Sequence, residues 1–249
     1  MNPVAVALIT LVVTFGGAFV GMALPGQHLS EDTKDVVRLG TGLVGTIAAL
    51  VLGLLIASAK TSYDTQNSQV KQMTADIILL DLILAQYGSE SHAARDLLRR
   101  SADPLVERIW REKSSRSAKD APFESSPEAA ATFTAVQELS PQNDAQRALK
   151  ARAMQTIGDL AQTRLLLFAQ ADGSIPMPFL AVLVSWLTII FASFGLFSRP
   201  NPTVIAALFI FALSASGAIL LILELSQPFE GLLEISSAPL RNALAPLSP

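Results

Sequence analysis

Side chains that could carry out chemistry are few and scattered in this sequence. The only histidines, His28 and His92, stand far apart, so they offer no spacing for a metal site or a general base. There is no cysteine, which excludes disulfides, zinc–thiolate sites, iron–sulfur clusters and thiol nucleophiles. The sequence also lacks a glycine-rich phosphate loop, a serine nucleophile elbow and a paired-histidine zinc motif. We therefore expect no catalytic residue, no metal and no cofactor, and we do not expect an enzyme.

One carboxylate, Glu224, follows an uncharged run from residue 200 to residue 223. A carboxylate in this place lies either in the hydrated headgroup zone of a membrane or within protein, where it needs a partner. The residues after it break the helix and continue as an amphipathic tail, which either lies on the membrane or folds back on the water-soluble domain of the chain. We expect structural or gating roles for five residues of this region, with Arg241 as the partner of Glu224: Glu224, Pro228, Phe229, Gly231 and Arg241.

The elements that must position these residues follow from composition. With 51% hydrophobic and 16% charged residues and a mean hydropathy of +0.44, the chain is too apolar for an ordinary soluble protein. The apolar residues gather in four uncharged stretches, 1–30, 39–59, 173–198 and 200–223. Each can cross a bilayer, since a helix needs about 20 residues to do so, and backbone in lipid must be helical. No Lys or Arg precedes the first stretch, so it is predicted to be a retained helix rather than a secretion signal.

The sequence therefore predicts an all-α integral membrane protein with a helical domain inserted between its second and third membrane helices. Nothing from Thr61 to Gln86 breaks a helix, so the second helix should continue well past the membrane. Further helices are expected at 90–113, 128–139 and 142–170, with Ser140 and Pro141 starting the last of these, and a loop at 114–127. The expected divisions are a first helix pair at 1–59, the domain at 60–175, a second pair at 176–225 and the tail at 226–249.

Charge distribution predicts the orientation in the membrane. Four crossings place both termini on the same side as the domain, and most of the 18 Lys and Arg residues lie on that side. Only Lys34, Arg38 and Arg199 lie in the two short loops, so the positive-inside rule favours a cytoplasmic domain and cytoplasmic termini. Acidic and basic residues nearly balance within the domain, which argues against nucleic acid as a partner.

The second helix has two faces that could matter for assembly. Small residues recur every four positions, a spacing that lets another backbone approach, either in ordinary packing or between identical subunits: Thr41, Gly45, Ala49, Gly53 and Ala57. A different face carries large apolar groups followed by serines, and we expect it to line a central passage whose apolar ring gates ions by excluding water. These pore-lining candidates are Ile47, Val51, Leu54, Ser58 and Ser62.

Four segments of the sequence resemble a known family. They are residues 44–64, ending in GLLIASAKTSYD, then RPNPT at 199–203, ELSQPFEGL at 224–232 and SAPLR at 237–241. Together they are similar to the bestrophin-like bacterial membrane family, once described only as a domain of unknown function. Bestrophins proper are pentameric anion channels with four membrane helices per subunit, cytoplasmic termini and a hydrophobic neck formed by the second helix, so the resemblance implies a similar assembly here. This chain has Ser226 and Gln227 where the family tends to show an acidic–basic pair, so no charged role is expected at those two positions.

These observations lead to one leading hypothesis and one alternative. The first is a homo-oligomeric, pentameric channel for small inorganic ions in the bacterial inner membrane, with the second helix around the axis. The alternative is a non-conducting scaffold or signalling protein whose helical domain binds a cytoplasmic partner. Balanced charge in the domain gives no prediction of ion selectivity.

Overall fold

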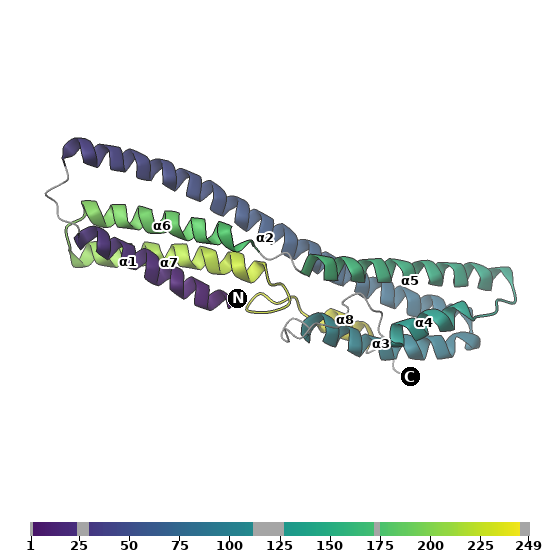
Figure 1. Cartoon of the computed structure of the whole chain (residues 1–249). Helices are drawn as coiled ribbons and strands as arrows, with labels where there is room; N and C mark the ends of the chain where they lie inside the picture. Colours follow the sequence, from purple (N-terminus) through teal and green to yellow (C-terminus); the bar gives the residue numbers. More distant parts are fainter. Residues whose placement is uncertain (1, 24–29, 112–126, 172–174, 245–249) are drawn as a thin grey trace. The chain divides into compact units, whose positions relative to one another are not determined.

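The computed structural model describes residues 2–23, 30–111, 127–171 and 175–244 (Figure 1). Within these ranges the chain is helical and has no strand, as predicted. Four helices are long and apolar enough to cross a membrane: α1 (Pro3–Ala23), α2 (Glu31–Tyr87), α6 (Met177–Phe197) and α7 (Pro202–Leu225). The chain forms two compact units, which we call the membrane unit (Met1–Tyr63 with Ser174–Gln227) and the helical unit (Asp64–Gly173 with Pro228–Pro249).

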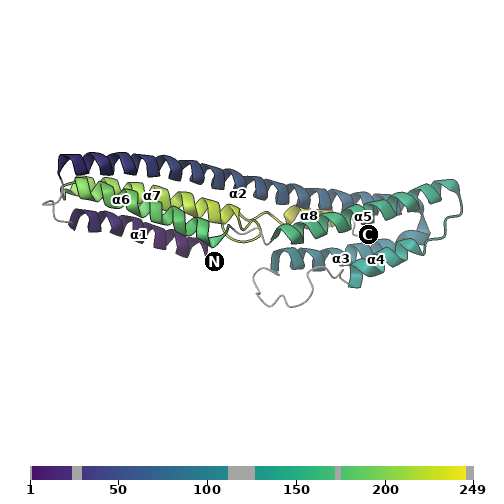
Figure 2. The ribbon, with the colours of Figure 1, turned by 45° about the horizontal axis from the view of Figure 1, so that its top comes forward.

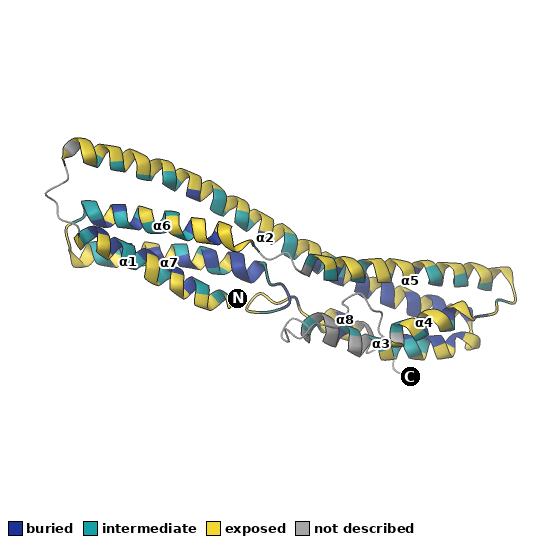
Figure 3. Cartoon of the chain, in the orientation of Figure 1, coloured by how far each residue is buried: buried dark blue, intermediate teal, exposed yellow. Residues whose placement is uncertain are grey.

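In the membrane unit, α1 packs against α6 and α7 through small side chains. The residues of α1 that are buried are all small and recur at steps of three or four: Ala7, Thr10, Thr14, Ala18 and Gly21. Small residues let two backbones approach closely, which favours van der Waals packing between helices in lipid. The large side chains of α1, among them Leu8, Val12 and Val20, are exposed on the other side of the helix. Figure 2 shows α1 running along α6 and α7, and Figure 3 shows the exposed side of α1.

A short connection joins the last two membrane helices. α6 ends at Phe197 and α7 begins at Pro202, so the connection can form only an antiparallel hairpin. Asn201 caps α7, because its Oδ1 accepts a hydrogen bond from the backbone N–H of Thr203 at 3.0 Å. Pro202 follows at the first helical position, where a missing N–H costs nothing.

α2 is one helix of 57 residues, and the predicted continuation beyond Ala59 is confirmed. Its later part belongs to the helical unit, where its apolar residues lie at the centre of a hydrophobic core. Leu80, Leu84 and Tyr87 of α2 pack there with residues of the neighbouring helices, including Leu98, Val136 and Ala153. α2 ends at Tyr87, and Gly88 follows it with a φ of +116°, a conformation that other residues rarely adopt.

The rest of the helical unit consists of a short 3-10 turn (Ser89–Ser91), α3 (His92–Arg111), α4 (Pro127–Gln137), α5 (Asp144–Ala171) and α8 (Ala238–Leu244). The predicted start of α5 at Ser140 and Pro141 is wrong. Asn143 caps the helix instead, because its Oδ1 accepts from Gln146 N at 2.8 Å while Gln146 Oε1 accepts from Gln142 N at 2.7 Å. The loop predicted at 114–127 lies outside the described residues except for Pro127, which begins α4.

Candidate functional site

The first candidate site is the part of α2 that lies in the membrane unit. One face of this segment is covered by the chain itself. Ala48 and Ala59 are buried, and Leu52, Leu55 and Ile56 beside them pack against α6 and α7, where the partners are Leu180, Leu183, Ile219, Ile222, Leu223 and Leu225. This contact fixes which side of α2 remains available to other molecules.

The opposite face of α2 is an exposed apolar stripe. Its residues recur at steps of three or four, the period of a helix face, and their side chains are between 40% and 76% exposed: Leu39, Leu43, Ile47, Leu50 and Leu54. Only 11% of the apolar 18-residue stretch of α2 is buried inside the chain, against 28% of the corresponding stretch in each of the other three membrane helices. The exposed side of α2 is visible in Figure 3. α2 is therefore the membrane helix with the most surface left for lipid or for another subunit.

The five pore-lining candidates lie on or beside this stripe. Ile47, Leu54 and Ser58 are exposed, whereas Val51 and Ser62 are half-buried. The chain thus leaves open the face on which they were predicted to act. Leu39, Leu43 and Leu50 extend the same stripe and were not among the candidates, although their spacing in the sequence could have identified them.

Among the described residues, the clear contacts of the small-residue stripe of α2 with the rest of the chain lie at its beginning. Thr41 Oγ1 donates a hydrogen bond to Ser193 Oγ of α6 at 3.0 Å. A Cβ built on Gly45 would lie 4.0 Å from Ile190 Cδ1, and a Cβ built on Gly53 would meet nothing within 4 Å. Ala49 and Ala57 are exposed. The role of the small-residue stripe in packing between subunits therefore stays a prediction.

The close backbone contact inside the chain lies elsewhere, between α1 and α6. A Cβ on Gly21 would overlap the carbonyl of Ala192, and a Cβ on Gly195 would overlap the carbonyl of Ala18. Gly17 is also close, with Thr188 Cγ2 at 3.0 Å from its built Cβ. The GxxxG pair Gly17 and Gly21 is visible in the sequence, but the same pattern occurs in many apolar segments and does not indicate which helix it contacts.

The end of α7 forms the second candidate site. Glu224 is only 4% exposed, and it takes part in a polar or electrostatic contact. The helix closes at Ser226, whose N–H donates to Ile222 O at 3.1 Å and whose Oγ donates to the same carbonyl at 2.7 Å. Because Glu224 is buried and makes a contact, a structural role fits it better than a position in the hydrated headgroup zone. The pairing of Glu224 with Arg241, which is exposed on α8, stays a prediction.

The segment after α7 folds onto α3 in the helical unit. The ring of Phe229 stacks edge-on against Trp110 with 5.5 Å between centroids, and Trp110 Nε1 donates to Ile235 O at 2.8 Å. Pro228 is buried and its carbonyl accepts from Ile235 N at 2.7 Å, while Gly231 supplies a φ of +94°. Of the two alternatives for the tail, the structure has the folded-back one.

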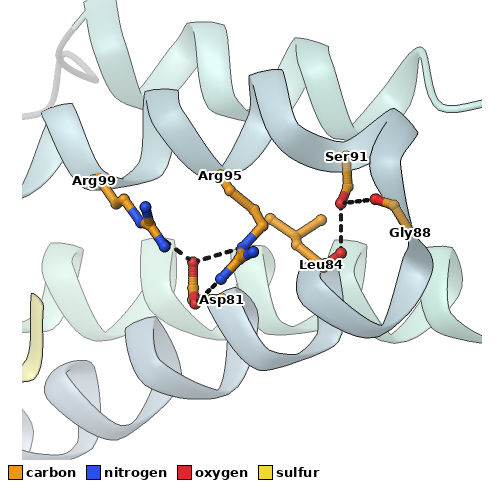
Figure 4. Close-up of polar contacts among 6 residues, drawn as sticks. All are labelled: Asp81, Leu84, Gly88, Ser91, Arg95 and Arg99. Atoms are coloured by element: carbon orange, nitrogen blue, oxygen red, sulfur yellow. Dashed lines mark hydrogen bonds and ion pairs between the residues drawn. The ribbon is translucent and has the colours of Figure 1, made fainter. Parts of the chain in front are cut away.

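A buried ion-pair cluster joins α2 to α3 in the helical unit (Figure 4). Asp81 is 1% exposed and accepts two hydrogen bonds from Arg95, from Nε at 3.0 Å and from Nη2 at 2.7 Å. Arg99 Nε lies 3.8 Å from the same carboxylate. Hydrogen bonding to Asp81 raises the pKa of Arg95, so the guanidinium group stays charged. This cluster was not predicted from the sequence, although an aspartate alone among the apolar residues 77–84 is a recognisable signal.

Ser91 completes this corner of the helical unit. Its Oγ donates to the carbonyl of Leu84 and lies 2.8 Å from that of Gly88, so the last turn of α2 is tied to the start of α3 (Figure 4). In the part of the chain that the structure describes, no three His, Asp or Glu residues gather as a metal site would require. The Asp81–Arg95 pair connects α2 to α3, and Ser91 connects the last turn of α2 to the turn that precedes α3.

The membrane helices and the helical unit define a class of all-α membrane protein, and the comparisons with known proteins identify the family. The model of the bestrophin-like domain matches residues 8–240, so the chain belongs to the bestrophin-like family. The predicted resemblance is thereby confirmed.

A solved structure has the same fold. It is a mutant of a bacterial bestrophin homolog from Klebsiella pneumoniae, and the match has a TM-score of 0.65 over 99% of this chain and 98% of that chain, at 13% sequence identity. A search of curated proteins by sequence found no match.

Proposed function

We propose that the protein is a homo-oligomeric, pentameric ion channel of the bacterial inner membrane, with α2 of each subunit around the axis. The observation that carries this proposal is the exposed apolar stripe of α2, opposite the face that packs on α6 and α7. A helix covered so little by its own chain needs other neighbours, and membership of the bestrophin-like family supports identical subunits as those neighbours.

On this proposal Ile47, Val51 and Leu54 form rings that narrow the passage. Apolar rings exclude water when narrow, so ions pass only when the ring widens or becomes more polar. Ser58 and Ser62 follow them with hydroxyl groups. The helical unit, inserted between the second and third membrane helices, lies on the cytoplasmic side together with both termini.

The test is a current measurement on purified protein in planar bilayers. Leu54→Ser and Val51→Ser should raise the current severalfold, because a hydroxyl group lowers the cost of wetting the ring. The matched control is Leu213→Ser, which makes the same change at an exposed leucine of α7 and should leave the current unchanged.

Native mass spectrometry must show the same oligomer for all three variants. If the assembled wild type and both α2 variants carry no current in any salt, the channel proposal is wrong. The protein would then be a non-conducting scaffold whose helical unit binds a cytoplasmic partner.

A further inference from the structure

We propose that the helical unit binds a small hydrophobic carboxylate in a cavity between α2, α3, α4 and α5. The cavity has a volume of about 340 Å³ and lies wholly within this unit. Pockets for small molecules begin at about 300 Å³ and occur between the helices of bundles. The proposal concerns binding alone and does not depend on ion conduction.

The floor and walls of the cavity are apolar. Met73 and Leu80 of α2 and Leu98 of α3 are almost completely buried and form its inner surface, with Ile157 and Leu160 of α5 on another side. A water molecule needs two to four polar partners, which this surface does not offer. The inner surface therefore suits a hydrocarbon group.

The polar groups of the cavity favour an anion at one place. Arg164 of α5 is the charged side chain among the described residues that line it. Ser101 donates its hydroxyl hydrogen to Leu98 O at 2.7 Å, and Thr134 donates to Ala130 O at 3.1 Å, so neither hydroxyl needs a ligand. A guanidinium group has five N–H donors and binds a carboxylate with two parallel hydrogen bonds, so Arg164 can keep its existing contact and still bind one.

An entrance lies between α4 and α5. Ala130 and Phe133 of α4 and Ala161 of α5 line the cavity and are exposed. A ligand can enter there with its hydrocarbon end first and leave its carboxylate beside Arg164. A straight-chain carboxylate of about eight carbons has this form, and we take octanoate as the probe.

The experiment measures binding of radiolabelled octanoate to the full-length protein in phosphatidylcholine nanodiscs by equilibrium dialysis. Nanodiscs without protein correct for partition into lipid. Affinity should rise about fourfold for each methylene from hexanoate to octanoate, the change expected when a CH₂ group is buried. Octan-1-ol should bind at least tenfold more weakly than octanoate, because it lacks the charge-assisted hydrogen bonds.

Two pairs of variants locate the site. Ala161→Trp should lower octanoate affinity at least tenfold by filling the cavity, whereas Ala151→Trp, at an exposed position of the same helix outside the cavity, should change it less than twofold. Arg164→Gln should remove the preference for octanoate over octan-1-ol, and Arg152→Gln should keep it, although both variants lose one positive charge.

A measurement on the wild type tests the proposal without variants, which can misfold. Octanoate should slow deuterium exchange in residues 129–134 and 157–164 and leave α6 and α7 unchanged. Unchanged exchange in these two segments, or equal octanoate binding by wild type and a folded Ala161→Trp variant, would overturn the proposal. Equal affinity for octanoate and octan-1-ol in the wild type would overturn the assignment of a carboxylate.

Discussion

The carboxyl group of Asp76 is buried in the helical unit, where a negative charge is unfavourable. Asp76 is 6% exposed; Gln72 Nε2 donates to its Oδ1 at 2.9 Å, and its Oδ2 is buried without a hydrogen-bond donor among the described residues. Burial raises the pKa of Asp76, the Gln72 bond opposes this, and the negative charge of Asp159 on α5 adds to it. The charged form of Asp76 is therefore disfavoured in the folded protein.

We predict that Asp76→Asn stabilises the protein at pH 7.5. The pKa of Asp76 is higher in the folded protein than in the unfolded chain. The wild type therefore loses stability as the pH rises through the folded-state pKa. Removing the charge should raise the free energy of unfolding by on the order of 1 kcal/mol, which corresponds to roughly 2–4 °C in melting temperature. The gain should shrink as pH falls towards about 3.9, where wild-type Asp76 is protonated as well.

Thermal unfolding by circular dichroism between pH 4 and pH 8 measures this effect. Asp144→Asn is the control, because Asp144 is exposed and its ion pair with Arg147 is a surface pair of little energetic value. A gain for Asp76→Asn that does not depend on pH would show that charge is not its cause.

The sequence showed these buried acids only indirectly. Asp76 and Asp81 lie among the apolar residues of α2 and are buried. They therefore differ from charged residues on a solvent-exposed helix face, where acidic and basic side chains alternate. The arginines that neutralise Asp81 come from α3, and the pairing depends on the corner at Gly88, whose geometry a sequence pattern does not specify.

At the scale of helices, the contact between α1 and α6 is the tightest that glycine makes in the described structure. We predict that Gly195→Leu destabilises the folded chain, because any side chain at this position overlaps the backbone of Ala18. The cost of such overpacking is at least about 1–3 kcal/mol. Gel filtration and thermal unfolding in detergent should show a lower melting temperature and loss of the monodisperse peak.

Gly53→Leu makes the matched change on α2. The chain itself offers no obstacle within 4 Å of this position, so the helices of a single subunit should remain folded. Native mass spectrometry should instead show a smaller oligomer, since the leucine would block approach of another subunit. Unchanged oligomers would show that the small stripe of α2 faces lipid.

Helix limits were largely predictable because proline, glycine and capping residues mark them, as at Asn201–Pro202 and Gly88. The start of α5 was not, because Ser140–Pro141 and Asn143 offer competing caps within four residues. The partner of each small stripe was not predictable either. A stripe of small residues permits close approach, but it does not specify which helix approaches.

For the whole molecule we predict that the helical unit lies in the cytoplasm. The sequence has no cysteine, so single cysteines can be introduced and labelled without background. A maleimide that cannot cross membranes should label Ser30→Cys and Asn201→Cys in intact spheroplasts. It should label Ser140→Cys, at an exposed position of the helical unit, only after lysis. Labelling of Ser140→Cys before lysis would place that unit outside the cell.

The contact between α1 and α6 also has a consequence for biosynthesis. About 170 residues separate Gly21 from Gly195, so a ribosome adding roughly 5–20 residues per second needs roughly 10 to 30 s to supply the partner of α1. During that interval α1 must remain in the bilayer without α6. It can do so because its residues 3–23 carry no charge and Thr10 and Thr14 donate to carbonyls of their own helix. The first helix can therefore remain stable in lipid until α6 and α7 have been synthesised.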